Sequence, residues 1–106
     1  MSARPTATLA TSSGDGERIF SVRGQYARTV RALIEAGSKG VTALDVSGTW
    51  ALRLSHYVFI LRRDYGLKIE TVWEKHDSAA GPGRHGRYVL KTPARIIAGN
   101  ADREAA

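Results

Sequence analysis

The spacing of apolar residues changes once along this chain, from the period of a helix to the period of a strand. Across residues 25–36 the apolar side chains recur three and four positions apart, at Tyr26, Val30, Leu33 and Ile34. A second helical stripe runs from about residue 49 to residue 64, at Leu54, Val58 and Leu61. Residues 69–74 then alternate, with Ile69, Thr71 and Trp73 on one side. The pattern predicts two long helices followed by a strand.

A shorter helix is predicted between the two long ones. Thr42 suits an N-cap, because Asp45 follows three residues later as in a capping box, and Gly48 would end a helix over residues 43–47. Val41, just before the cap, is predicted to add a short strand.

A second strand is predicted over residues 87–90, antiparallel to residues 69–74. The polar, glycine-rich segment 75–86 between them is expected to be an irregular wing loop. Three helices followed by this hairpin predict an α+β fold, namely a winged helix-turn-helix with three helices and a C-terminal β-hairpin wing.

The two ends of the chain are expected to differ from the domain between them. Residues 1–18 contain almost no bulky apolar side chain, so a flexible N-terminal arm is predicted there. The winged helix domain is assigned to residues 19–91, beginning with an apolar strap of Ile19, Phe20 and Val22. Residues 92–106 are assigned to a C-terminal tail, in which Ile96 and Ile97 are candidates for folding back.

Composition excludes several classes of protein. The chain has no cysteine, which rules out a disulfide scaffold and a cysteine-based zinc finger. It has no apolar run near the ~20 residues of a membrane span, and its N-terminus does not resemble a secretory signal. A cytoplasmic location is therefore predicted, with no cofactor.

The net charge of +6 points to a polyanionic partner. Residues 1–18 and residues 92–106 each hold two arginines and two carboxylates, so the whole excess lies between them. Duplex DNA is the predicted partner, with transcription or prophage regulation as the role.

The predicted DNA-binding residues fall in three places. The third helix would enter a major groove through Arg53, His56 and Arg63. The wing would clamp the DNA backbone through Lys75, Arg84, His85 and Arg87. From the first helix, Arg28 and Arg31 would add phosphate contacts if they face the same side.

Three segments of the chain resemble a known family. The segment YVFILRRDYGLKIET (57–71), with GVTALDVSGTW (40–50) before it and GRHGRYVL (83–90) after it, is similar to small winged helix domain proteins of α-proteobacteria and their prophages. It also resembles a phage-type helix-turn-helix group, whose signature residues are here Leu61, Arg62, Gly66, Ile69, Glu70 and Thr71. The resemblance covers residues 25–91 and implies a winged helix fold. The chain departs from the phage-type group at Trp50, where glycine is usual, and at Tyr57, where arginine is usual.

Two other partners remain open at this point. A docking or homodimerisation module would use the apolar residues Phe59, Ile60, Ile96 and Ile97, because fold alone does not decide function. RNA binding is a third reading. No catalytic constellation is recognised, so an enzyme is not predicted.

Several side chains are predicted to have structural roles instead of binding roles. Arg62 is expected to pair with Asp64, Glu70 or a helix carboxylate rather than to contact DNA. The larger aromatic residues are expected in the core or at its edge, namely Trp50, Trp73, Tyr26, Tyr65 and Tyr88. His76 and His85 flank the wing loop, but their spacing does not favour a metal site.

Overall fold

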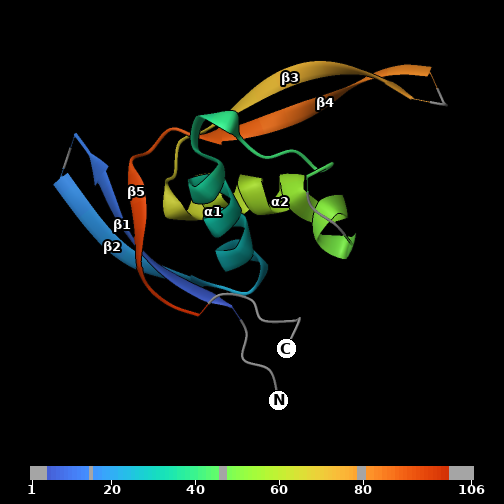
Figure 1. The fold of residues 1–106 in the computed structure, drawn as a ribbon. Coiled ribbons are helices and arrows are strands. Elements are labelled where there is room, and N and C mark those ends of the chain that lie inside the picture. The colour runs from blue at the N-terminus through green and yellow to red at the C-terminus, as the bar shows by residue number, and fades with distance from the viewer. Residues whose placement is uncertain (1–4, 15, 46–47, 79–80, 101–106) are drawn as a thin grey trace.

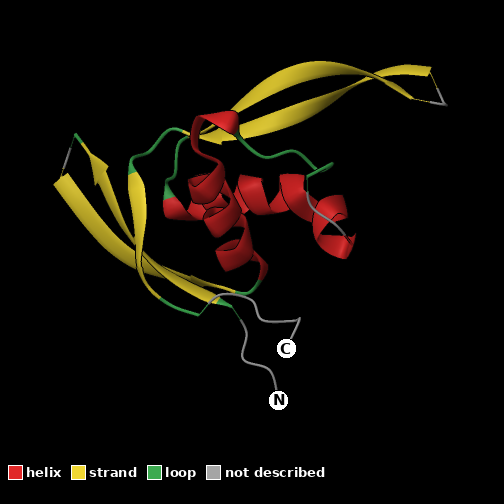
Figure 2. Cartoon of the chain, viewed as in Figure 1, coloured by secondary structure: helices red, strands yellow, loops and turns green. Residues whose placement is uncertain are grey.

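A computed structural model of the chain describes residues 5–14, 16–45, 48–78 and 81–100. This part contains two α-helices, a 3₁₀ turn (η1, Gly37–Lys39) and five strands in two antiparallel sheets. Figure 1 shows the helices between a three-stranded sheet and a long separate hairpin. Helix α1 contacts β1 and β2 on one side and β4 on the other. The helices thus form a middle layer, with the three-stranded sheet on one side and the hairpin on the other (Figure 2).

The two long helices form where the apolar spacing predicts them. Helix α1 spans Gln25–Ala36, as predicted, and buries Ala27, Val30 and Leu33. Helix α2 spans Gly48–Tyr65, within one or two residues of the prediction. Its apolar stripe is fully buried, with Leu54, Val58 and Leu61 at 1% exposure or less. These residues meet the stripe of α1 in the core.

The prediction of three helices is wrong for the described residues. Thr42 does form the expected cap, because its hydroxyl accepts the N–H of Leu44 at 3.1 Å. The Asp45 carboxylate accepts the backbone N–H of Thr42 at 2.9 Å. Only a turn follows over residues 43–45, and residues 46–47 lie outside the description. The physical reason is length, since a segment of five residues before Gly48 gains few bonds for a costly first turn.

The predicted flexible arm is also wrong where the structure describes it. Strands β1 (Thr6–Ser13) and β2 (Gly16–Arg23) form a hairpin, and β5 (Ala94–Ala98) pairs with the other edge of β1. Ala7 and Leu9 are fully buried in it. The segment was misjudged because its buried side chains are small, and small residues bury well once a third strand and α1 cover them. The tail folds back as β5, with Ile96 half-buried and Ile97 exposed.

The second hairpin is longer than predicted. Strand β3 covers Ile69–Ser78 and β4 covers Gly81–Leu90, so most of the predicted irregular loop is paired. The register runs without a break from Ile69↔Leu90 to Ser78↔Gly81. Glycine weakens a strand but does not remove its backbone hydrogen bonds, which is why the pairing continues through the glycine-rich segment. Val41 forms the predicted short strand as a single bridge to Tyr88.

Candidate nucleic-acid interface

The exposed side of α2 carries the three residues predicted to read DNA. Arg53 and His56 are exposed, and the Arg63 side chain is 58% exposed. All three lie away from the buried stripe of Leu54 and Val58, as the helical period requires. No ion pair or hydrogen bond holds the Arg53 side chain among the described residues. The helix therefore presents cations to solvent along a face that nothing else in the described chain covers.

Arg63 differs from Arg53 because it has local partners. Its Nε donates to Oδ1 of Asp64 at 2.8 Å, and its guanidinium lies 5.1 Å from the centre of the Phe59 ring. The same hydrogen bond lowers the pKa of the Asp64 carboxyl. Arg63 is thus partly neutralised and held over Phe59, which is itself 51% exposed.

Trp50 fixes the first turn of α2 against α1. Its indole Nε1 donates to the hydroxyl of Thr29 at 2.9 Å, and that hydroxyl donates to the carbonyl of Gln25. The guanidinium of Arg28 lies 5.4 Å from the centre of the Trp50 indole. Trp50 and Arg53 are about one turn apart, so Arg28 lies near the N-terminal half of α2, which carries Arg53.

Arg31 lies elsewhere, although it belongs to the same helix as Arg28. Its guanidinium donates to the carbonyl of Thr6 at 2.7 Å, and its side chain is directed at β1. The structure therefore places Arg28, but not Arg31, beside the exposed face of α2.

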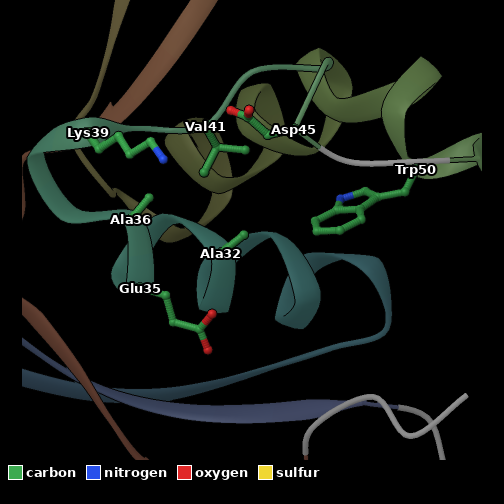
Figure 3. A pocket seen from close by; sticks show the side chains of 7 residues that line it. All are labelled: Ala32, Glu35, Ala36, Lys39, Val41, Asp45 and Trp50. Atoms are coloured by element: carbon green, nitrogen blue, oxygen red, sulfur yellow. The ribbon is translucent and has the colours of Figure 1, made fainter. Parts of the chain in front are cut away.

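A hollow of about 390 Å³ lies between α1, the Val41–Asp45 segment and Trp50. Its floor is formed by small apolar side chains, and Figure 3 shows the Trp50 indole as one wall. Lys39 and Asp45 lie at its rim. The hollow adjoins the turn that replaces the predicted second helix.

Two of the predicted wing residues bind a carboxylate of their own strand pair. Arg87 donates to Glu74 through Nε at 2.7 Å and through a terminal nitrogen at 3.1 Å. The His85 Nε2 lies 3.0 Å from the same carboxylate. The hydrogen bond from Arg87 lowers the pKa of the Glu74 carboxyl and raises the pKa of Arg87. Arg87 also donates to the carbonyl of Lys39, which ties the hairpin to η1.

The other two wing residues have no carboxylate partner among the described residues. Lys75 and Arg84 are exposed and face each other in the register of the hairpin. Arg84 lies over Trp73, with its guanidinium 5.5 Å from the ring centre. No partner holds the Lys75 side chain in the described part of the chain. Of the four predicted wing residues, Lys75 and Arg84 are therefore the two whose charge no described carboxylate neutralises.

Arg62 has the structural role expected of it, with different partners. It donates to the carbonyl of Ile69 and, at 2.7 Å, to the hydroxyl of Thr71. It thus joins the end of α2 to β3 through a backbone oxygen and a hydroxyl, rather than through a carboxylate as predicted.

Metal ligands do not gather in the described part of the chain. No group of three or more histidine, cysteine, aspartate or glutamate side chains there could hold an ion. His85 contacts Glu74, while the side chain of His76 lies outside the described residues.

A long helix with an exposed basic face, followed in the chain by an antiparallel hairpin, has the element order of a winged helix domain. Comparison with known families gives the same result: residues 19–100 match the winged helix domain family, and the chain belongs to it. Winged helix domains are typically non-enzymatic. The match identifies the type of domain, and an origin in α-proteobacteria or their prophages is not part of it. No curated protein and no solved structure matches the chain.

Among the described residues, no helix is both long enough and apolar enough to cross a lipid bilayer.

Proposed function

We propose that this protein binds duplex DNA and acts as a cytoplasmic regulator of transcription, with prophage genes among its candidate targets. One observation carries the proposal: a winged helix domain presents Arg53 on α2, and Lys75 and Arg84 on the hairpin, as exposed side chains that no carboxylate of the described residues pairs with. Arg28, which lies beside Trp50, and the exposed His56 adjoin Arg53 and complete the proposed surface.

The other predicted contacts have weaker support. Arg63, His85 and Arg87 each have an acidic partner, so a phosphate would compete with Asp64 or Glu74 for them. Arg31 is directed at β1 and is set aside as a DNA contact. The proposed footprint therefore combines the first three turns of α2, the adjoining end of α1 and one face of the hairpin.

Fluorescence anisotropy with a labelled mixed-sequence duplex of about 30 base pairs tests the proposal. Between about 50 and 200 mM salt, the logarithm of the binding constant is expected to fall against the logarithm of the salt concentration with a slope of about −3 to −6, which corresponds to roughly three to seven neutralised phosphates. Replacing Arg53→Ala together with Arg84→Ala is expected to weaken binding about tenfold or more and to flatten the slope by about 2.

A matched control removes the same charge from another surface. Arg23 and Arg95 lie exposed on β2 and β5, so Arg23→Ala with Arg95→Ala lowers the net charge equally. This pair is expected to change the affinity by less than about threefold. Equal losses in the two double variants would show that only overall charge matters. Absence of binding at the lowest salt would reject the proposal, and preferential competition by structured RNA would redirect it.

A further inference from the structure

Trp73 lies on the surface of the hairpin, contrary to its predicted place in the core or at its edge. The residue is 61% exposed, although a tryptophan gains more from burial than most side chains. Trp73 is the fifth residue of β3 and lies about 13 Å along the strand from Ile69. Beyond its base, the hairpin extends away from the helices (Figure 1). A single exposed apolar side chain needs no special explanation, so the residues around Trp73 decide whether it belongs to a contact surface.

The register of the hairpin shows which residues share its face with Trp73. Directly opposed residues of an antiparallel pair lie on one face, and every second residue returns to it. The face therefore carries Ile69 with Leu90, and Thr71 with Tyr88, at its base. There it packs on the core, since Ile69 is buried and Tyr88 and Leu90 are partly buried against the same cluster. Further out, the same face carries Trp73, Lys75 and Arg84.

Charge differs between the two faces of the hairpin from Trp73 to Lys75. Lys75 and Arg84 lie beside Trp73, and the guanidinium of Arg84 lies 5.5 Å from the centre of the ring. The opposite face holds Glu74, which binds Arg87 and His85. Over this stretch the face with Trp73 is thus both aromatic and positively charged, and Glu74 lies on the other face.

The residue opposite Trp73 in the register is Gly86, which has no side chain of its own. A Cβ there would lie 3.0 Å from the methyl group of Thr71 and 3.7 Å from the ring of Tyr88, so packing within the hairpin explains the glycine. As a result, no side chain from the directly opposed position covers Trp73.

We infer that Trp73 contacts DNA directly, with its indole against the sugars and base edges of a groove and with Lys75 and Arg84 on the flanking phosphates. The inference rests on the proposed function and adds a contact by an aromatic ring to the basic footprint. An aromatic ring flanked by cations suits nucleic acid, because each nucleotide offers an apolar sugar and base beside a negative phosphate.

Two substitutions on one strand test the inference by affinity. Trp73→Ala is expected to weaken duplex binding by roughly fivefold at constant salt, which is the lower end of the range for an aromatic ring stacked on a base, because a contact in a groove covers only part of the ring. Val72→Ala is the matched control, because Val72 is also exposed, at 39%, and lies on the other face. It is expected to change the affinity by less than about twofold. Circular dichroism melting of both variants checks that the fold is retained.

Acrylamide quenching gives a second measurement. The chain has two tryptophans, so Trp73→Phe leaves only Trp50 as an emitter. In the unaltered protein, saturating duplex is expected to reduce acrylamide quenching, because the exposed indole of Trp73 becomes covered. In Trp73→Phe the reduction is expected to disappear or to become much smaller.

The results of these experiments can reject the Trp73 contact without rejecting DNA binding. Loss of affinity in Trp73→Ala together with DNA-dependent protection of Trp73 supports the contact. Unchanged affinity and quenching, in a protein whose binding still falls with Arg53→Ala, overturns the contact and leaves DNA binding in place. Equal losses in Trp73→Ala and Val72→Ala also overturn it, because the hairpin as a whole would then be responsible. If the unaltered protein binds no duplex, both proposals fail together.

Discussion

The two β-hairpins of this protein are built alike and supported differently. The hairpin of β1 and β2 has a third strand, β5, along its edge and α1 on its face. The hairpin of β3 and β4 is held at its base by the Val41 bridge and by Arg62, and its outer half extends away from the helices (Figure 1). A two-stranded hairpin is marginal alone in water, so the outer half depends on side-chain pairs such as Glu74 with Arg87. One hairpin is therefore part of the core, and the other is available for binding.

The largest expected effect is on the free energy of unfolding, and it comes from truncating a buried residue of the first hairpin. An exposed residue of the second hairpin serves as the comparison. Leu9 is fully buried in β1, and Leu9→Ala is expected to lower the free energy of unfolding by about 2–5 kcal/mol. Val72→Ala on the exposed hairpin is expected to lower it by about 0.5 kcal/mol or less. Urea unfolding followed by circular dichroism measures both. Similar losses of unfolding free energy in the two variants would contradict the conclusion that only the first hairpin is part of the core.

A smaller effect is expected at Gly40, where η1 passes the base of the second hairpin. Gly40 has φ +74°, and an added Cβ would lie 2.7 Å from the carbonyl oxygen of Tyr88. Gly40→Ala is expected to destabilise the protein by about 2–4 kcal/mol, from backbone strain and from the clash. Gly37 has a similar φ of +55° with open space around it, so Gly37→Ala isolates the backbone strain at about 1–2 kcal/mol. If the two variants unfold at the same urea concentration, the contact between Gly40 and β4 is unimportant.

The smallest expected effect concerns pH and the outer half of the second hairpin. Hydrogen bonds from Arg87 and His85 hold the pKa of Glu74 below its usual value of 4.5. A carboxyl whose pKa is lower in the folded state stabilises that state at pH values above 4.5, and this contribution is lost as the pH falls through the lowered pKa. Glu74→Gln is therefore expected to be less stable than the unaltered protein at pH 7, with the difference shrinking by pH 3.

A control on the same strand isolates this effect. Glu70 is exposed, and no ion pair involves it among the described residues. Urea midpoints of Glu70→Gln, measured from pH 7 to pH 3, are expected to follow those of the unaltered protein. A pH-independent difference for Glu74→Gln would mean that its charge does not stabilise the hairpin.

The sequence predicted the helices well because each has a complete apolar stripe. Leu54, Val58 and Leu61 repeat at helical spacing, and Gly66 directly follows the end of α2. The first sheet was missed for the opposite reason. In β1 the buried residues are mostly alanine and threonine, and they are covered by β5, more than eighty residues later in the sequence. No local pattern reveals a partner at that distance.

The sequence predicted which basic residues are exposed better than it predicted which partners the others contact. The basic residues of α2 follow from helical period alone, and so does their exposure. The partners of Arg31, His85 and Arg87 depend on which elements pack together, which a single sequence does not show. The alternation of residues 69–74 placed Trp73 correctly on the face of Ile69 and Thr71. It did not reveal that the hairpin is long enough to carry this residue beyond the helices.

The pairing of β5 with β1 also orders events during synthesis. The backbone N–H of Asn100 donates to the hydroxyl of Thr6, and the two residues are 94 positions apart. On a ribosome, β1 and β2 emerge first and can pair, while one edge of β1 stays open until residues 94–98 have been made. Contacts so distant in sequence slow folding, and an open strand edge invites pairing between nascent chains. Folding of the first sheet thus waits for the synthesis of β5, and a chain that stops before β5 would keep an open, aggregation-prone strand edge.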